Sequence, residues 1–508
     1  MRKICLLLSL KLILILPVHA QLLKATIKVD IDRQIGEIDK LIYGSFTEHL
    51  GRCIYGGIYD PNSSKADESG FRKDVLLATK NLGVSSVRWP GGNFASGYHW
   101  MDGIGPKESR PKRKDLAWGD TESNIIGTDE FLKFSLAAGV EPYICVNLGT
   151  GNWDEARNWV EYCNAPQGFY YSDLRAKNGH PSPYRVKYWG LGNEMDGDWQ
   201  MGHRNAEDYS KFALEAAKLM KWSDDSIKLI ASGSSNYGPD WINWNKTVLS
   251  TLRDHIDFIS LHHYAGNYDH DHYKFMAVTN RVDEIIRITE GLIQQVRSQY
   301  KVKKPIYIAF DEYNVWYRAF NDKKLEEHYN LQDALVIAMY MNVFLRHANV
   351  VKMANMAQLV NVIAPMMVTD DQLWLQTTYF PLQLYANNCS GMSLETLVQC
   401  DKYNAGEFTQ VPYLDVATVY NPKNQELIIN VVNRHLDQAI ETTIINQTGQ
   451  LEGKASIYEI NSPEITDENS PTGQKVKTIS KEMNVKGNTL VYRFPAHCFT
   501  MIKLKIVP

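Results

Sequence analysis

The hydrophobic pattern alternates between two periods over residues 36–375. Short apolar runs rich in β-branched and aromatic residues predict strands, and longer segments with apolar residues three and four apart predict helices. The predicted strands cover residues 40–46, 84–89, 141–147, 184–192, 228–233, 256–264, 305–312 and 350–360. The predicted helices cover residues 69–83, 127–139, 152–164, 205–222, 238–255, 278–300 and 330–348. Strands that alternate with helices in this way are typical of parallel βαβ units.

The number of predicted strands indicates how these units close. Eight strands are what a (β/α)₈ TIM barrel requires, and residues 36–375 fall within the size range of such barrels. A doubly wound open sheet is the alternative. Such sheets often carry a glycine-rich phosphate turn after the first strand, and this chain has none there. We therefore predict a catalytic barrel.

The pattern changes after about residue 375. Residues 376–508 contain short alternating segments, such as QELIINVVNRH, QAIETTIIN and FTMIKLKIV, separated by Gly, Pro, Asn and Asp. This pattern predicts a C-terminal antiparallel β-sandwich domain. The segment ATIKVDID, within residues 21–35, has the same character, so we predict an N-terminal strand that pairs into the sandwich.

The first twenty residues differ from the rest of the chain. Arg2 and Lys3 precede an apolar run that ends in Val-His-Ala before Gln21, the order found in secretory signals. We therefore predict a signal peptide over residues 1–20 and export to the periplasm or the extracellular space. Lys11 interrupts the run, so an uncleaved anchor is the alternative, although the run is short for a membrane-spanning helix. After cleavage we predict no membrane span.

Charge and cysteine content narrow the class of protein. Residues 1–20 carry three basic residues and no acidic ones, so their removal takes the formal net charge from −4 to −7. Without a basic excess, nucleic acid is not an expected partner. The six cysteines outside this segment lack CxxC spacing, which argues against a zinc site and a disulfide scaffold. Whether Cys389 and Cys400 form a bridge is left open.

Polar residues follow the predicted strands at the end where a barrel carries its chemistry. Asn193 and Glu194 end the fourth strand, and Asp311 and Glu312 end the seventh. Two carboxylates that converge on one rim meet the needs of glycoside hydrolysis, in which one protonates the leaving oxygen while the other attacks the anomeric carbon or directs water to it. That chemistry needs no metal and no cofactor, and its partner is a carbohydrate.

Less specific interpretations exist for each of these features. An Asn-Glu pair in a turn is usually a solvated bend, and only its pairing with Glu312 on the same rim favours catalysis. Arg88 could form a structural salt bridge, and Glu48 could be a plain rim charge. The run DHDHY (269–273) mimics a metal cluster, but we interpret it as a solvated or substrate-contacting loop.

Seven blocks of the sequence, in order, resemble the α-L-arabinofuranosidases of glycoside hydrolase family 51. The blocks are IYGSFTEHLGRCIYGGIYDP, VRWPGGNFASGYHWMDGIGP, RKDLAWGDTESN, YWGLGNEMDG, ISLHHYAGN, FDEYNVWY and MAQLVNVIAP. The chain departs from the family pattern at Tyr313, where tryptophan is more frequent, and at His263, a variable position. The resemblance also hints at a homo-oligomer.

The resemblance implies roles for individual residues in a retaining double displacement. Glu194 would be the general acid/base and Glu312 the nucleophile. Asn193 would bind the 2-hydroxyl of the sugar, an interaction that strengthens toward the transition state. The other residues implied to bind the substrate or to position the nucleophile are Glu48, Arg88, Asn93, Trp118, His262, Tyr264, Trp316 and Gln358.

The sequence thus predicts an exo-acting α-L-arabinofuranosidase that releases terminal arabinofuranose from plant polysaccharide side chains or oligosaccharides. Another retaining barrel glycosidase, an endo-glucanase or β-xylosidase, is the first alternative, and a non-catalytic carbohydrate-binding barrel is the second. Two geometric expectations follow. The pKa of the acid/base should be raised by the charge of the nucleophile, and carboxyl groups about 5–5.5 Å apart would indicate retention, whereas about 6.5–9.5 Å would indicate inversion.

Overall fold

The computed structural model describes residues 23–319 and 325–507. The predicted signal peptide, residues 1–20, lies outside the described residues. Within the described ranges, no helix has both the length and the apolar character needed to span a bilayer.

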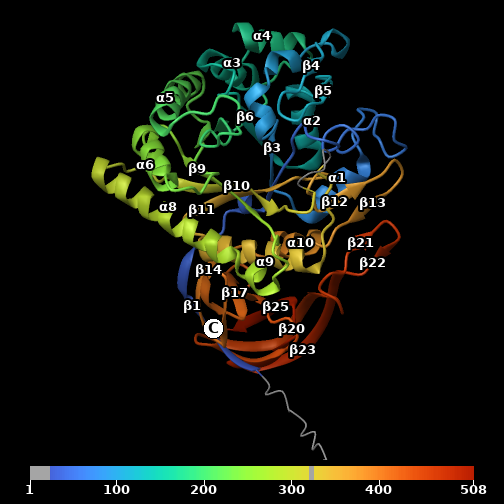
Figure 1. Ribbon diagram of the computed structural model, residues 1–508, viewed down its shortest axis with the longest axis vertical. Helices are drawn as coiled ribbons and strands as arrows, with labels where there is room; N and C mark the ends of the chain where they lie inside the picture. Colours follow the sequence, from blue (N-terminus) through green and yellow to red (C-terminus); the bar gives the residue numbers. More distant parts are fainter. Residues whose placement is uncertain (1–22, 320–324, 508) are drawn as a thin grey trace, which may run out of the picture.

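Eight parallel strands of the described chain close a barrel, which confirms the predicted fold class (Figure 1). In chain order they are β2 (Gly44–Phe46), β3 (Ser86–Trp89), β6 (Glu141–Val146), β7 (Tyr188–Leu191), β8 (Lys228–Ala231), β9 (Phe258–Ala265), β10 (Tyr307–Val315) and β11 (Val351–Ala357). Consecutive strands are hydrogen-bonded neighbours, and β11 pairs with β2 to complete the circle. The predicted Glu194 and Glu312 therefore belong to one rim.

Helices follow the barrel strands and cover them from outside. They are α1 (Lys73–Leu82), α2 (Thr128–Ala138), α3 (Trp153–Asn164), α5 (Ala206–Ser223), α6 (Trp241–Leu252), α8 (Thr279–Tyr300), α9 (Leu331–Arg346) and α10 (Tyr379–Asn388). Gly83 and Gly139 end α1 and α2 in the left-handed conformation, which a glycine adopts without steric cost. Sequence periodicity thus located these helix ends to within a residue or two.

Within the described residues, three α-helices were not predicted: α4 (Tyr170–Lys177), α7 (His272–Ala277) and α10. Helix α10 packs against α1, α9 and the 3-10 turn η1 (Lys40–Tyr43), which precedes β2. The barrel unit therefore extends to Asn388, beyond the predicted boundary at residue 375. The predicted alternation of strands and helices ends before α10. The apolar residues of this short helix lie on all its sides, so its sequence shows no helical periodicity.

Nine strands of the described chain form one continuous sheet below the barrel in Figure 1. Its order is β23-β20-β25-β18-β17-β14-β1-β19-β24. The strands are β1 (Leu23–Glu37), β14 (Met392–Gln399), β17 (Leu414–Asn421), β18 (Glu426–Asn433), β19 (Ile440–Asn446), β20 (Gln450–Asn461), β23 (Lys477–Gly487), β24 (Thr489–Phe494) and β25 (Cys498–Val507). Strands β1 and β19 run parallel, and the other neighbours run antiparallel.

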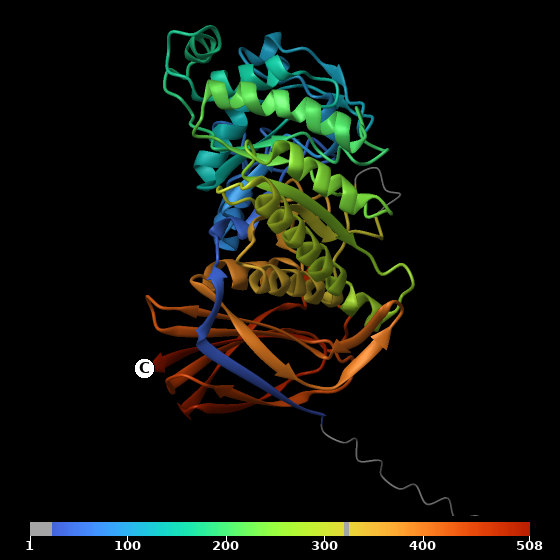
Figure 2. The same cartoon turned by 90° about the vertical axis from the view of Figure 1, so that its left-hand side faces the viewer.

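The sheet curls around its own apolar core. Residues from strands far apart in the order, such as Ile457 of β20 and Phe494 of β24, belong to the same buried cluster. Strand β1 passes from the barrel into the middle of this sheet, as Figure 2 shows. The N-terminal strand is thereby held by β14 on one side and β19 on the other.

Burial along the strands explains the two sequence patterns of this region. Residues of β19 and β24 alternate between buried and more exposed, because one face of each strand meets the core and the other faces outward. In β18, by contrast, Leu427–Asn433 are buried without interruption. Its second face lies against α9, which packs on β14, β17, β18 and β25.

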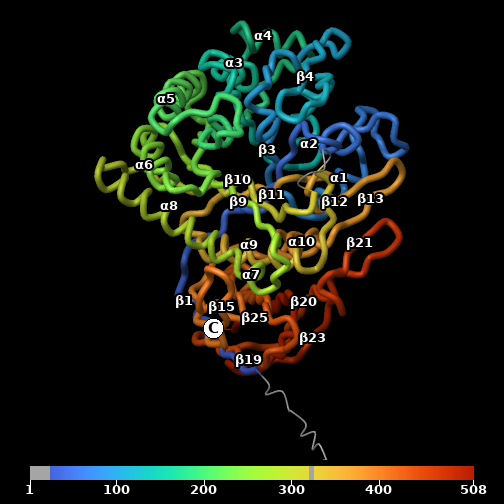
Figure 3. The backbone as a smooth tube through the Cα atoms, in the orientation of Figure 1, coloured from blue at the N-terminus to red at the C-terminus, as the bar shows by residue number. Residues whose placement is uncertain are grey.

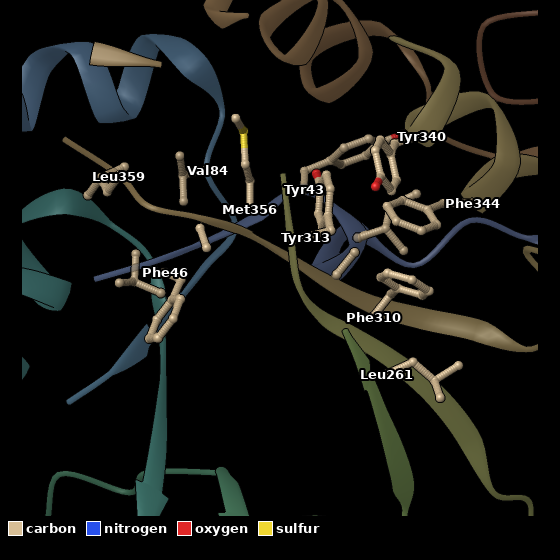
Figure 4. Close-up of a cluster of buried hydrophobic side chains, with 14 of the residues drawn as sticks. Tyr43, Phe46, Val84, Leu261, Phe310, Tyr313, Tyr340, Phe344, Met356 and Leu359 are labelled. Atoms are coloured by element: carbon tan, nitrogen blue, oxygen red, sulfur yellow. The ribbon is translucent and has the colours of Figure 1, made fainter. Parts of the chain in front are cut away.

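Helix α9 lies between the barrel and the sheet (Figure 3). Residues Leu331–Leu345 are buried all round, which accounts for a helix without a polar face. On the barrel side, Tyr340 and Phe344 pack against Phe310 and Tyr313 of β10 (Figure 4). The buried cluster of the barrel thus continues through the helix to residues of the sheet such as Phe499 of β25, while the core inside the curled sheet is a separate cluster.

The cysteines and the DHDHY run have structural explanations. Cys389 and Cys400 are both free thiols, so the bridge that the sequence left open does not form between them. In the DHDHY run, Asp271 caps the start of α7 by accepting from the Lys274 N–H, and His272 Nε2 lies 2.9 Å from the Arg434 carbonyl oxygen. These side chains serve the helix start and the contact with the sheet domain.

A buried ionic cluster connects α9 to the sheet. Asp415 of β17 accepts hydrogen bonds from Arg346 at 3.1 Å, from Arg434 at 2.7 Å and from the Asn342 amide at 2.7 Å. Burial opposes ionisation of Asp415, but the charges of the two arginines outweigh it, so the pKa of Asp415 lies below its ordinary value. The carboxylate is the shared counter-ion of both arginines.

We expect Asp415→Ala to destabilise the protein strongly. It leaves the fully buried Arg434 guanidinium without its carboxylate, and breaking a buried pair in this way costs about 3–5 kcal/mol. The midpoint of urea unfolding should fall accordingly. Glu482→Ala breaks an exposed pair with Lys454 and should leave the midpoint unchanged. Equal, small shifts for the two variants would contradict this account of the interface.

Candidate active site

The carboxyl ends of the barrel strands bring most of the predicted site residues together. Arg88 comes from β3, His262 and Tyr264 from β9, and Glu312 from β10. Glu48, Asn193, Glu194 and Gln358 follow directly after β2, β7 and β11. Their side chains contact one another in a continuous polar network that stands above an apolar floor. Leu41, just before β2, and one residue from each of the strands β6 to β11 form that floor. The residues on the strands are Tyr143, Tyr188, Ile230, Phe258, Ala309 and Met353.

Arg88 lies at the centre of this network, with its guanidinium buried. Its Nη1 donates to Glu312 Oε2 at 2.7 Å, and its Nη2 donates to Asn193 Oδ1. Its Nε lies 3.7 Å from Asp311 Oδ2. Its guanidinium carbon also stands 4.6 Å from the centre of the Phe46 ring, which confines it on the side of β2. A single cation thereby fixes side chains from β7 and β10.

Glu312 is held on both carboxylate oxygens. Besides the Arg88 bond to Oε2, the Tyr264 hydroxyl donates to Oε1 at 2.8 Å. Its side chain is only 9 % exposed, so a reacting group must approach it from the barrel mouth. The charge-assisted bond from Arg88 and the bond from Tyr264 fix the orientation of the carboxyl group.

Glu194 occupies the turn after β7 in a left-handed conformation, with φ of 45°. That conformation is unusual for a residue with a side chain and is frequent at functional sites. Its Oε1 lies 2.9 Å from His262 Nδ1, and its Oε2 accepts from the Trp199 indole N–H at 2.7 Å. Burial, together with the negative charge of Glu312, raises the pKa of Glu194 against the opposing bonds from His262 and Trp199.

The two glutamates face each other closely. One carboxylate oxygen of Glu194, one of Glu312 and a ring nitrogen of His262 all lie within 4.8 Å of one another. Three such side chains could in principle surround a metal ion. Here the surrounding carboxylates raise the pKa of His262 to about 10, which favours a proton on the nitrogen that faces Glu194, and Arg88 already donates to Glu312 Oε2, so this donor set does not favour a cation.

An extra residue in β10 explains why both Asp311 and Glu312 reach the interior. Between Ala309 and Glu312, β10 advances three residues while β9 advances two, from Ser260 to His262. The pairing of β10 with β11 shifts over the same stretch. Such a bulge breaks the alternation of side chains and is frequent at barrel rims. As a result two consecutive acidic side chains both contact Arg88.

Asp311 and His262 form the lower layer of the network. Asp311 accepts from the Tyr143 hydroxyl at 2.7 Å and from the Ser260 hydroxyl. Burial opposes its charge, but Arg88, His262 and Ser260 outweigh burial and hold the pKa of Asp311 at about 2. Burial likewise opposes the charge of His262, yet Glu312 and the hydrogen bonds to Asp311 and Glu194 raise its pKa to about 10.

Glu48 stands beside the glutamate pair. Its Oε1 accepts from the Phe94 N–H and from the Trp118 indole, both at 3.0 Å, and Gln358 lies 3.4 Å from its Oε2. Burial and the charge of Glu312 raise the pKa of Glu48 to about 7, although both donors to Oε1 oppose the shift. Glu48 is therefore a buried acid of the site and not a solvated rim charge.

The glycines of the WPGGN turn keep the centre of the site open. A Cβ at Gly92 would stand 3.2 Å from Glu48 Oε2, 3.4 Å from Glu312 Oε2 and 3.5 Å from Asn193 Nδ2. Three polar groups from different strands thus surround one small space. A glycine leaves that space free for a bound molecule.

The remaining predicted residues lie at the edge of this network. Asn93 begins the 3-10 turn Asn93–Gly97, and Trp118 lies between the short strands β4 (Arg113–Lys114) and β5 (Thr121–Glu122). Trp316 follows β10 and stands edge-to-face against Tyr264, with ring centroids 5.3 Å apart.

The residues at which the sequence departs from the family pattern face away from the site. His263 points outward from β9, where its Nδ1 lies 2.6 Å from the Tyr340 hydroxyl, and burial together with Arg281 lowers its pKa to about 4. Tyr313 packs against α9 (Figure 4). Neither side chain contacts the carboxylates.

Sequence reasoning gave no role to four contributors below and beside the pair, although it had placed one of them, Asp311, at the end of the seventh strand: Tyr143, Ser260, Asp311 and Trp199. Tyr143 and Ser260 lie within strands, where a polar residue in an apolar run was the available signal. Trp199 stands five residues after Glu194 in a turn that the sequence left without a role.

Comparison with known proteins agrees with this geometry. Residues 78–281 match the model of the α-L-arabinofuranosidase 1 domain, and residues 311–498 match that of the α-L-arabinofuranosidase C-terminal domain. The chain is 47% identical over 434 residues to the intracellular exo-α-(1→5)-L-arabinofuranosidase 1 of Bacillus subtilis, covering 83% of this chain and 87% of the relative. The chain belongs to the α-L-arabinofuranosidases of glycoside hydrolase family 51.

Solved structures of this family have the same architecture. An arabinose complex of the Thermotoga maritima α-L-arabinofuranosidase is 39% identical, with a TM-score of 0.89 over 95% of this chain and 100% of that one. A family 51 α-L-arabinofuranosidase of Bifidobacterium longum is 34% identical, with a TM-score of 0.90 over 95% and 99%. The resemblance inferred from seven sequence blocks is thereby confirmed, and the chain is a glycoside hydrolase.

The comparisons correct the prediction of export. The Bacillus subtilis relative and two others, from Halalkalibacterium halodurans and Acetivibrio thermocellus, are named intracellular arabinofuranosidases. The prediction rested only on the order of charged and apolar residues in the first twenty positions. The amino-acid composition of that segment is independent of the barrel fold and of the active site. The fold and the site therefore gave no support to the prediction of export.

We expect Gly92→Ala to reduce hydrolysis of aryl glycosides by about 10- to 100-fold, because the methyl group fills space shared by three polar groups of the site. Steady-state kinetics would measure the loss, and the melting temperature should stay close to that of the parent enzyme.

Gly291→Ala is the matched control. Gly291 lies on α8, where an added Cβ would meet no other atom within 4 Å, so this variant should keep full activity. Full activity of Gly92→Ala would show that substrate does not enter the space beside Gly92.

Proposed function

We propose that this family 51 enzyme is a retaining, exo-acting α-L-arabinofuranosidase in which Glu194 is the general acid/base and Glu312 the nucleophile. The observation that carries the proposal is the approach of the two carboxylates to within 4.8 Å at their nearest oxygens. This separation suits direct attack by one carboxylate and leaves too little room for the intervening water that inversion requires.

In the first step, Glu312 attacks the anomeric carbon while Glu194 protonates the departing oxygen. Glu194 suits this role because burial and the charge of Glu312 raise its pKa, which keeps the acid form populated. Arg88 and Tyr264 orient the two oxygens of Glu312. The step forms an ester between the sugar and Glu312.

In the second step, Glu194 accepts a proton from water, which attacks the anomeric carbon, breaks its bond to Glu312 and releases the sugar. Formation of the ester removes the negative charge of Glu312, so the main charge that favours the acid form of Glu194 is lost. The protonated His262 at 2.9 Å then stabilises the Glu194 carboxylate. The same residue can therefore act first as an acid and then as a base.

Neighbouring residues supply the polar groups for a furanose ring. Arg88 fixes the carboxamide of Asn193 through its oxygen, and its Nδ2 donates one proton to Gln200 Oε1 at 3.4 Å, so the second proton on Nδ2 remains for a sugar hydroxyl. Glu48, beside Gly92, offers a further acceptor. Asn93, Trp118, Trp316 and Gln358 complete the proposed substrate-binding set at the edge of this space.

The proposed substrates are terminal α-L-arabinofuranosyl groups of arabinan, arabinoxylan or their oligosaccharides. The name of the Bacillus subtilis relative, an exo-α-(1→5)-L-arabinofuranosidase, supports exo action. Product analysis by NMR on branched arabinoxylan and arabinan, with a panel of aryl glycosides beside it, should find free arabinose released first with the α configuration. A preference for aryl xylosides, or the release of internal oligosaccharides, would favour another barrel glycosidase.

Variants of the two glutamates should differ in their dependence on the leaving group. We expect Glu194→Ala to lose about 10²- to 10⁴-fold of its activity on natural linkages and much less of the first step on an activated aryl arabinofuranoside, which needs no proton. Glu312→Ala should lose activity on both substrates. Steady-state and burst kinetics would measure these losses.

Sodium azide distinguishes the acid/base role of Glu194 from the nucleophile role of Glu312. Azide should react with the glycosyl-enzyme of Glu194→Ala and give an arabinosyl azide of retained configuration, because the anion needs no general base. Glu215→Ala, which removes an exposed carboxylate on α5, is the control and should behave like the parent enzyme. Turnover of Glu312→Ala at the parent rate would falsify the nucleophile assignment.

A further inference from the structure

Asp311 is a buried anion that the proposed mechanism does not use. It precedes the proposed nucleophile in sequence and is 1 % exposed, below the plane of the two glutamates and next to the apolar floor. The extra residue of β10 turns its side chain inward beside that of Glu312. A carboxylate in such a place is stable only if its charge and its oxygens are satisfied.

Its oxygens are satisfied by groups from three other strands. Tyr143 of β6 donates to Oδ2, and Ser260 of β9 donates to Oδ1. Arg88 of β3 approaches Oδ2 at 3.7 Å, and His262 Nε2 stands 3.4 Å from Oδ1. None of these contacts reaches the space beside Gly92, so Asp311 does not touch a substrate placed there.

Ser260 and His262 connect Asp311 to the proposed acid/base, Glu194, through hydrogen bonds. His262 Nε2 lies 3.0 Å from Ser260 Oγ, whose hydroxyl proton is directed to Asp311 Oδ1. The other ring nitrogen, Nδ1, stands 2.9 Å from Glu194 Oε1. Since the Ser260 hydroxyl proton is engaged by Asp311, its oxygen must accept from His262, so the ring carries a proton on Nε2 and has Nδ1 directed at Glu194.

We propose that Asp311 is a positioning residue, which acts through Ser260 and His262 to keep the imidazole charged and directed at the Glu194 carboxyl throughout the reaction. The proposal rests on the proposed function in assigning the acid/base role to Glu194. Asp311 itself forms no bond to the substrate and exchanges no proton with it.

The charges around His262 change during the reaction, and Asp311 is the counter-ion that does not change. Three carboxyl groups face His262: Glu194 at 2.9 Å, Asp311 at 3.4 Å and Glu312 at 3.5 Å. When the sugar ester forms, Glu312 is neutral and no longer balances the imidazolium. Asp311 is unchanged by the reaction, so it remains as the counter-ion of His262 while Glu194 must ionise and act as a base.

The other titratable groups nearby cannot replace Asp311 as the counter-ion of His262. Arg88, Tyr143, Cys145 and Glu312 also face Asp311, and Tyr237 lies near Glu194 and the His262 backbone. Arg88 is a cation and the tyrosines and the thiol are neutral, since burial raises the pKa of Tyr143, Cys145 and Tyr237. Asp311 is the carboxylate of this group that stays anionic in both steps.

The test is Asp311→Asn in the full-length enzyme with an activated aryl arabinofuranoside, for which the second step limits turnover. We expect kcat to fall by about 10- to 100-fold. The acidic limb of its pH profile should move to higher pH, because a less charged His262 stabilises the Glu194 carboxylate less. Sodium azide should restore most of kcat, because it attacks without a general base.

A second measurement does not depend on activity. In the parent enzyme, ¹⁵N NMR of labelled histidine should show a ring, assigned by its loss in His262→Asn, that keeps both protons above pH 8. In Asp311→Asn the same ring should lose a proton at least about one pH unit lower. Asp283→Asn is the matched control, because it removes a carboxylate 2.9 Å from the ring of another histidine, His347, outside the site, so its His262 titration and its azide response should match those of the parent enzyme.

If Asp311→Asn does not fold, Ser260→Ala provides the test, because this variant removes only the hydroxyl that bridges Asp311 and His262. Ser260→Ala should then show the same changes in kcat, azide response and His262 titration to a smaller extent. The proposal is overturned if azide restores no activity and the His262 titration is unchanged in the variant that folds. Failure of the proposed function would appear separately, as a parent enzyme that does not hydrolyse the aryl arabinofuranoside while the NMR difference persists.

Discussion

The burial of the Arg88 guanidinium is the constraint on which the rest of the site depends. A cation at that depth must be surrounded by acceptors, and it finds them in Glu312, Asn193 and the nearby Asp311. These residues come from β10 and from the end of β7, on separate parts of the barrel. Satisfying one charge therefore fixes the proposed nucleophile and the amide beside the proposed acid/base in one arrangement.

Four carboxyl groups share this interior, of which Glu194 is the least buried, and their surroundings give them different properties. Asp311 has a pKa of about 2 because Arg88 and His262 outweigh its burial. Glu48 has a pKa of about 7 because burial and the charge of Glu312 outweigh its two donors. Glu194 shifts in the same direction as Glu48. Burial alone would make them all weak acids, and the position of the two cations decides which remains ionised.

The sheet domain supports the barrel through α9 and stays apart from the polar network of the site. Helix α9 shares its surface between the two, and Asp415 connects it to the sheet through two arginines. On the barrel side, α9 packs against Tyr313 and His263, the outward neighbours of Glu312 and His262. The helix thus confines the outer faces of the two strands that carry His262, Tyr264 and Glu312.

The sequence by itself determined the barrel, the order of its strands and the residues at their ends, because hydrophobic periodicity is a local property and the carboxyl ends of parallel strands must share a rim. It also indicated the family through seven blocks. Only the tertiary structure decided that Asp311 and Glu312 both turn inward, that Ser260 and Tyr143 donate to Asp311, that Cys389 and Cys400 stay apart and that α10 packs with the barrel helices. Alternation along a single strand would place Asp311 and Glu312 on opposite faces. The register of β10 against β9 and β11 overrides it, and register is set by pairing between segments distant in sequence.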